Sequence, residues 1–213
     1  MRVGVLALQG AVQEHERALA RLGVEARRVR LPADLEGLGG LILPGGESTV
    51  MGRYLREYGL DRAIRERAIR ERSAGGLALF GVCAGAILLC REVDGAPGAL
   101  GLLPARARRN AYGRQLASFE AAVAGPAGSF RGLFIRAPIL EPLEGCEVLA
   151  SLADGSAVLL RAGRALAASF HPELVGDDRL HALFLEMVGY ADSAPQALQA
   201  PEHAGGVAQA GRR

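Results

Sequence analysis

A cysteine at a glycine-flanked corner is the strongest chemical signal in the sequence. Cys83 lies in G-V-C-A-G at residues 81–85, after a short apolar run that predicts a buried strand and before an apolar stretch that predicts a helix. This is the layout of a nucleophile elbow, in which glycine permits a strained turn and the helix N-terminus favours a thiolate. Because free cysteines are often buried, a small structural hydrophobic residue is the competing interpretation.

A second signal is S-F-H-P-E at residues 169–173. Pro172 disfavours helical geometry, so His171 and Glu173 are expected outside a helix, and residues two apart in an extended chain point to the same side. The carboxylate can then accept the imidazole N–H, while the other ring nitrogen takes a thiol proton. With Cys83 the pair predicts a Cys-His-Glu triad for acyl transfer through a thioester. The competing interpretation is a loop histidine beside a solvated glutamate.

The composition fits one α/β domain, alone or followed by a tail, because the chain has 213 residues and 50% of them are hydrophobic. A net charge of +2 gives no electrostatic argument for a nucleic-acid partner. Three cysteines without a C-x-x-C pair predict neither a disulfide framework nor a zinc site. We therefore expect no metal, no cofactor and a cytoplasmic location, and we recognise no signal peptide and no membrane-spanning run.

Lysine is absent from the sequence, and this absence excludes two kinds of chemistry. The glycine-rich stretch at residues 40–48 cannot be a phosphate-binding loop, which needs a lysine after its last glycine. Catalysis through a lysine Schiff base is excluded for the same reason.

The pattern of apolar runs predicts a doubly wound, mostly parallel α/β sheet. Strands are expected at residues 3–8, 24–30, 41–43 and 77–80, separated by helices that end near Leu22, Leu55 and Arg72. In such a sheet ligands lie beyond the carboxyl ends of the strands. The Gln9-Gly10 turn, the glycine turn at residues 45–47 and Cys83 all follow such ends.

The second half of the chain predicts additional, partly antiparallel strands. These are expected at residues 115–123, 132–135, 148–152, 157–161 and 165–170, followed by an amphipathic helix at 180–190. Residues 193–213 lack periodicity and predict a disordered tail after a domain that spans residues 1–192.

Several single residues carry weaker signals. Ser48 or Thr49 is expected to cap the helix that follows. Cys90 is expected inside a helix, and both Cys90 and Cys146 are interpreted as structural.

The remaining basic residues give no firm assignment. The cluster at residues 106–109, with Arg114 nearby, fits a solvated edge first, recognition of a substrate carboxylate second and nucleic acid last. His15, His181 and His203 have no metal-ligand spacing and are expected on the surface or on helix faces.

The motifs together resemble the class I, triad-type glutamine amidotransferases, and more closely the glutaminase subunits of pyridoxal phosphate synthases. The resemblance spans roughly residues 3 to 190. Besides the cysteine motif, it rests on V-G-V-L-A-L-Q-G-A-V at 3–12, L-I-L-P-G-G-E-S-T at 41–49, R-N-A-Y-G-R-Q at 109–115, S-F-E at 118–120, F-I-R-A-P at 134–138 and S-F-H-P-E-L at 169–174.

The resemblance implies a glutaminase that converts L-glutamine to L-glutamate and ammonia, and we expect both hydrolase and lyase activity of the chain. A separate synthase subunit would join the ammonia to a pentose phosphate and a triose phosphate, which agrees with the absence of lysine here. No nucleic-acid or membrane partner is implied.

The resemblance also implies roles for single residues. Cys83 would be the nucleophile, His171 the acid and base, and Glu173 its orienting partner. The remaining implied positions are the substrate contacts Gly46, Glu47, Ser48, Arg109, Ile135 and Arg136, and the oxyanion donors Gly46 and Ala84.

Two other interpretations stay open. The chain could be an inactive partner-binding subunit that kept the fold, although the intact triad argues against this. It could also be a γ-glutamyl hydrolase, or the glutaminase of another amidotransferase, although the Gln9-Gly10-Ala11 and Arg109-Asn110 signatures favour the pyridoxal phosphate branch.

Overall fold

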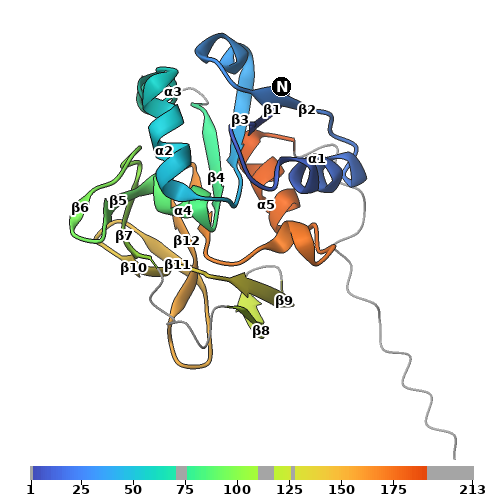
Figure 1. The fold of residues 1–213 in the computed structure, drawn as a ribbon. Helices are drawn as coiled ribbons and strands as arrows, with labels where there is room; N and C mark the ends of the chain where they lie inside the picture. Colours follow the sequence, from blue (N-terminus) through green and yellow to red (C-terminus); the bar gives the residue numbers. More distant parts are fainter. Residues whose placement is uncertain (1, 71–75, 110–117, 126–127, 191–213) are drawn as a thin grey trace, which may run out of the picture.

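The computed structural model describes residues 2–70, 76–109, 118–125 and 128–190. The tail expected at 193–213 and most of the motif at 109–115 lie outside these residues. A nine-stranded sheet runs through the molecule in the order β2-β1-β3-β4-β13-β12-β11-β8-β9 (Figure 1). A smaller sheet, in the order β10-β7-β5-β6, lies beside it.

The first half of the large sheet is parallel. It consists of β1 (Arg2–Leu6), β2 (Ala26–Val29), β3 (Leu38–Leu43), β4 (Ala78–Val82) and β13 (Ala165–Ala168). Every residue of β3 and β4 is buried, as expected for central strands that are covered on both faces.

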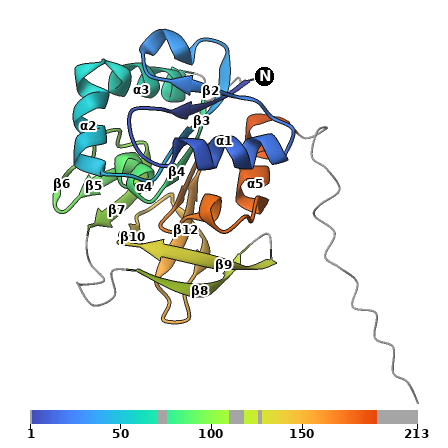
Figure 2. The same ribbon diagram turned by 45° about the vertical axis from the view of Figure 1, so that its right-hand side comes forward.

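Helices cover both faces of this parallel half (Figures 1 and 2). One face carries α1 (Val12–Arg21) and α5 (Arg179–Val188), and the other carries α2 (Ser48–Glu57), α3 (Leu60–Arg70) and α4 (Ala84–Leu89). Alternate residues of β3 point to the two faces: Ile42 packs in the core beneath α1 and α5, whereas Leu41 and Leu43 pack in the core beneath α2 and α4.

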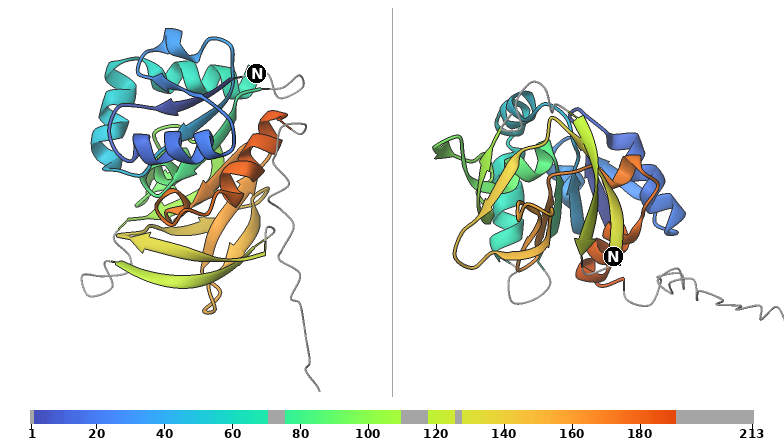
Figure 3. Two further views of the ribbon diagram at one scale, coloured as in Figure 1. Left: turned by 90° about the vertical axis from the view of Figure 1, so that its right-hand side faces the viewer. Right: turned by 90° about the horizontal axis from the view of Figure 1, so that it is seen from below.

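The second half of the large sheet is antiparallel, and consists of β12 (Ala157–Ala162), β11 (Glu147–Ser151), β8 (Ser118–Gly125) and β9 (Gly128–Ile135). In the left view of Figure 3 the yellow strands β8 and β9 lie at the opposite end of the molecule from β1 and β2. The predicted α/β fold is therefore confirmed, as a mixed sheet in which antiparallel strands extend a parallel half.

The small sheet was not predicted. Its strands are β5 (Cys90–Val93), β6 (Ala96–Pro97), β7 (Leu103–Arg108) and β10 (Ile139–Pro142). The expectation that Cys90 lies in a helix is wrong, because α4 ends at Leu89 after six residues and Cys90 begins β5. Two short 3-10 helices, η1 (Pro32–Leu35) and η2 (Pro172–Leu174), complete the fold.

Candidate active site

Cys83 lies at the corner between β4 and α4, as the elbow motif predicts. Its backbone φ of 49° is in a region that non-glycine residues seldom adopt. Both flanking glycines are required by close approach of the backbone: a Cβ on Gly85 would lie 1.9 Å from the Leu43 carbonyl oxygen, and one on Gly81 would lie 2.6 Å from the backbone of Gly85. The sequence therefore holds the thiol on a strained turn that larger residues would break.

His171 and Glu173 are brought together at the start of η2. The Nδ1 atom of His171 lies 2.7 Å from Oε1 of Glu173, and both side chains are buried. The expectation that neither residue lies in a helix is wrong for Glu173, which is the second residue of the η2 turn. Proline at the first position of a short helix is favourable, so Pro172 begins this turn instead of preventing it.

The imidazole of His171 also interacts with Cys83. Burial disfavours the imidazolium, but the hydrogen bonds to Cys83 and Glu173 and the charges of those residues outweigh it, and raise the pKa of His171 to about 10. The backbone N–H of His171 donates to the Leu133 carbonyl at 2.8 Å, which ties η2 to β9. A Cβ on Gly45 would lie 2.5 Å from the imidazole Cε1, so glycine there makes room for the ring.

A cavity of about 390 Å³ opens beside Cys83 at the carboxyl ends of the parallel strands. Glu173 does not line it, because it is buried behind His171. The cavity brings together all the other predicted site residues: Gly46, Glu47, Ser48, Cys83, Ala84, Arg109, Ile135, Arg136 and His171. The carbonyl oxygen of Ile135 lies 3.8 Å from the Cys83 sulfur.

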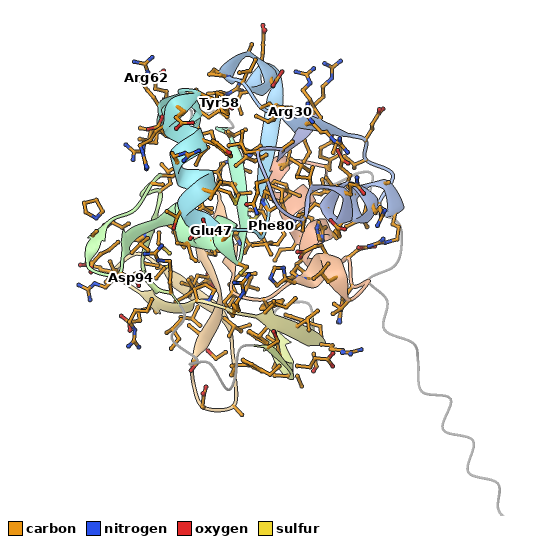
Figure 4. The ribbon with its side chains drawn as sticks, in the orientation of Figure 1. Arg30, Glu47, Tyr58, Arg62, Phe80 and Asp94 are labelled. Carbon is orange, nitrogen blue, oxygen red and sulfur yellow. The ribbon has the colours of Figure 1, made fainter. Side chains whose placement is uncertain are left out.

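Glu47 lies at the start of α2 (Figure 4) and is the residue that caps this helix. Its carboxylate accepts the N–H groups of Val50 at 2.8 Å and Thr49 at 3.1 Å. The expectation that Ser48 or Thr49 caps the helix is wrong, because the helix begins one residue earlier than such a cap requires. The two backbone hydrogen bonds lower the pKa of Glu47 and keep its carboxylate charged at the cavity.

The two arginines of the cavity are held differently. Arg109 donates to Oδ2 of Asp94 at 2.6 Å and to the hydroxyl of Thr49 at 3.0 Å, which fixes its guanidinium between β7 and α2. Arg136 is exposed at the cavity edge, just after β9, and its φ is 46°. Cys83, Asp94 and Arg136 are the three non-glycine residues with positive φ in the described part of the chain. Cys83 and Arg136 line the cavity, and Asp94 accepts a hydrogen bond from Arg109, which also lines it.

Gln9 is a cavity residue whose contacts the sequence did not predict. Its side-chain oxygen accepts the backbone N–H of Glu47 at 2.9 Å, and a Cβ on Gly46 would lie 2.5 Å from that oxygen. The Ala11 N–H also donates to the Gly45 carbonyl at 3.1 Å. The turn before α1 therefore holds the glycine loop in place.

His15 and His181 were expected on the surface or on helix faces, and they lie on buried faces of α1 and α5. Both are completely buried, and they hydrogen-bond to each other behind Glu173. The helical spacing of the apolar residues already indicated that both histidines are buried. His15 lies four residues before Leu19, and His181 lies four before Leu185, so each falls on the apolar stripe of its helix.

The basic cluster at residues 106–109 is an exposed edge whose charges are largely paired. Arg106 pairs with Glu92, and Arg108 pairs with Glu141. Arg114 lies outside the described residues. No described helix is long and apolar enough to cross a membrane, and the described residues hold no group of His, Cys, Asp and Glu arranged for a metal ion.

A thiol that shares a cavity with an imidazole oriented by a buried carboxylate can attack a carbonyl carbon and form a thioester. Comparison with known proteins agrees with this chemistry. Residues 5–190 match the model of the SNO glutamine amidotransferase family.

The chain is also similar to curated proteins named pyridoxal 5'-phosphate synthase subunit PdxT. The one from Thermus thermophilus is 56% identical over 191 residues, covering 88% of this chain and 97% of that protein. The one from Deinococcus radiodurans is 51% identical, covering 89% and 98%. The one from Chloroflexus aurantiacus is 50% identical, covering 88% and 100%.

Solved structures show the same fold. A crystal structure described as a glutamine amidotransferase superposes with a TM-score of 0.82 at 53% identity, covering 89% of this chain and all of that one. The PurLQS structure from Thermotoga maritima superposes with a TM-score of 0.62 at 19% identity, covering 87% and 97%, and supports the fold alone.

These matches confirm the expected glutamine amidotransferase family and contradict the expected lyase activity. The expected lyase activity is wrong for this chain, because the matched family is one of glutamine amidotransferases, and a glutaminase of that kind cleaves the amide by adding water. The family model covers most of the chain, and the relatives are at least 50% identical over nearly their full length. The chain therefore belongs to the SNO glutamine amidotransferase family.

Proposed function

We propose that this chain is the glutaminase subunit of a pyridoxal 5'-phosphate synthase, and that Cys83, His171 and Glu173 are its catalytic triad. The observation that carries the proposal is the buried hydrogen bond between His171 and Glu173, with His171 and Cys83 together in the wall of the cavity. Similarity to the PdxT subunits supports the assignment to this synthase.

In the first half of the reaction, the Cys83 thiol gives its proton to His171, and the sulfur attacks the side-chain amide carbon of glutamine. The carbon–nitrogen bond breaks, and His171 donates its proton to the departing ammonia. Because Nδ1 of His171 faces Glu173, Nε2 is the ring nitrogen that accepts and donates the proton. A pKa near 10 keeps this imidazolium available as a general acid at neutral pH.

In the second half, water attacks the thioester, His171 takes a proton from that water, and the sulfur–carbon bond breaks to release glutamate. The oxyanion formed in each half needs N–H donors already in place. Ala84 can supply one, since the first N–H groups of a helix have no partner inside it. Gly46 is the proposed second donor, because the next N–H, that of Glu47, is already directed to Gln9.

The rest of the cavity fits the amino-acid end of glutamine. The α-ammonium group would lie against the Glu47 carboxylate and the Ile135 carbonyl, both of which line the cavity. The α-carboxylate would be bound by Arg136, whose guanidinium is exposed at the edge, with Arg109 nearby. Ser48 lies beside Glu47 at the start of α2 and completes this set of contacts.

We further propose that residues 1–192 form one amidotransferase domain and that the chain acts in the cytoplasm, since all three cysteines are free. The test of the function is glutamate release from L-glutamine by the purified chain, measured alone and with a pyridoxal phosphate synthase subunit. Release that is specific for glutamine supports the proposal. If the pair released no glutamate from glutamine but cleaved γ-glutamyl peptides, the assignment to this pathway would be wrong.

A further inference from the structure

Behind the proposed triad lies a buried pair of histidines that the reaction above does not use. His15 comes from α1 and His181 from α5, and neither has any exposed surface. Nδ1 of His15 lies 2.9 Å from Nε2 of His181. On its other side, Nε2 of His15 lies 3.9 Å from Oε1 of Glu173, the oxygen that also contacts His171.

The pair is packed in an aromatic environment. The ring of Phe80, on β4 near the centre of the molecule in Figure 4, meets both imidazoles edge-on, with centroids 6.5 Å from His15 and 5.7 Å from His181. Apolar surroundings disfavour a charged imidazolium. Accordingly, burial lowers the pKa of His15 well below its usual value and that of His181 to about 4.

The charges that face the pair are few. His15 faces His181, His171 and Glu173. His181 faces Asp177, Asp178 and Arg21 on its outer side. The acidic groups favour protonation of His181, but burial is the larger effect, so both rings are neutral at pH 7.

Two neutral rings that share one hydrogen bond have two arrangements. If Nδ1 of His15 donates, its Nε2 presents a bare lone pair to the Glu173 carboxylate, which is repulsive. If Nε2 of His181 donates instead, the His15 Nδ1 accepts and the His15 Nε2 carries the hydrogen toward Glu173, which is attractive. The nearby carboxylate therefore selects the second arrangement.

We propose that His15 is a positioning residue, whose Nε2–H holds the Glu173 carboxylate in line with His171, and that His181 sets the tautomer of His15. The inference rests on the proposed function, because it assigns Glu173 the role of orienting His171. The other carboxylate oxygen, Oε2, and the His15 Nε2 are both buried and without a hydrogen-bond partner among the described residues. At 3.9 Å from Oε1, the His15 Nε2–H can attract the same carboxylate oxygen that contacts His171.

Nitrogen NMR of the imidazole rings tests the tautomers directly, without any enzyme assay. The chain has only four histidines, so single substitutions assign the spectrum of the full-length, ring-labelled protein. We expect His15 and His181 both to carry hydrogen on Nε2 at pH 7. A His15 ring protonated on Nδ1, or an imidazolium at either position, would overturn the proposal.

A matched pair of variants then separates positioning from packing. His15→Gln can present an amide N–H near the place of the imidazole Nε2, whereas His15→Asn reaches only as far as Nδ1. We expect His15→Asn to lower kcat about tenfold with KM nearly unchanged, by analogy with the loss of hydrogen-bond partners behind metal-binding histidines. The upper limb of its pH–rate profile should move to lower pH, while His15→Gln recovers most of the rate.

If the two variants had equal kcat values and the same pH–rate profile, His15 would serve only for packing, and the proposal would be wrong. If His15→Asn does not fold, the tautomers of the native protein still decide the question. If the native chain proves to hydrolyse no glutamine, the proposed function fails, but the ring spectrum remains a separate test of the His15–Glu173 arrangement.

Discussion

The imidazole Nδ1 of His171 lies 2.7 Å from Oε1 of Glu173, and this contact is buried beneath the cavity that contains Cys83. A hydrogen bond in this position fixes which ring nitrogen faces the thiol and favours the charged imidazolium. Glu173 therefore acts on the reaction only through His171, and its loss should lower the rate less than the loss of His171 itself.

Glu173→Gln should be milder than His171→Ala. The glutamine side chain can still touch the ring but no longer carries the charge that favours the imidazolium, so we expect kcat to fall by roughly ten- to a hundredfold, against a thousandfold or more for His171→Ala. Steady-state kinetics of both variants, with circular dichroism as a check on folding, give the ranking. The reverse order would mean that Glu173 serves mainly to build the η2 turn.

The same pair predicts a pH effect on activity. The pKa of His171 is raised to about 10 by its hydrogen bonds to Cys83 and Glu173, which outweigh its burial. In Glu173→Gln the pKa of His171 should drop, so the upper limb of the kcat/KM profile should move toward neutral pH. An unchanged upper limb would show that Glu173 does not set the protonation of His171.

Arg136→Ala should weaken glutamine binding, raising KM more than it lowers kcat. A carboxylate contact that is equal in the ground and transition states has this kinetic signature. Arg131→Ala is a matched control on β9, the strand that precedes Arg136, because Arg131 is exposed and pairs with Glu120 away from the cavity. A defect confined to kcat would place Arg136 in the chemical steps or at a partner interface.

Acid should destabilise the fold through His181. Burial lowers the pKa of His181 to about 4, so the unfolded chain binds this proton more readily, and stability is lost as pH falls below about 6.5. We expect a loss on the order of 2 kcal/mol between pH 7 and pH 5 from this group. Denaturant unfolding of the wild type and of His181→Leu measures it. The variant should be less stable at pH 7 but should lose less on acidification, and equal losses would contradict the prediction.

Docking of a synthase subunit should raise the turnover of the free chain. The glycine loop at residues 45–47 is held by Gln9 and Ala11, and glycine allows a peptide plane to reverse at little steric cost. Contact at this turn would then select the loop arrangement whose N–H serves the oxyanion. Glutamate release at saturating glutamine should rise as synthase is added and level off when the subunits are equal in number. A rate already maximal without synthase would refute gating but leave the triad untouched.

Much of the site was predictable because its residues follow the ends of strands that are themselves easy to recognise. β3 and β4 are fully buried apolar runs bounded by glycine, and parallel strands bring their carboxyl ends to one edge. The residues after these strands, Gly46 and Cys83, had to meet there.

The small sheet escaped prediction for a physical reason. β7 reads L-P-A-R-A-R, with exposed arginines and a proline, and its stability comes from pairing with β5 and β10 and not from its own sequence. The His15–His181 contact was equally hidden, since it joins residues 166 positions apart on two helices. Their helical spacing indicated burial, but only the tertiary fold shows what they contact.

The most direct test of the account is glutamate release from L-glutamine by Cys83→Ala, measured beside the wild type with the synthase subunit present. Cys83→Ala removes a single sulfur atom from the cavity wall, so the variant should keep its circular dichroism spectrum while its rate falls by about a thousandfold or more. Near-normal glutamate release by the folded variant would contradict a thioester on Cys83, and with it the proposed mechanism.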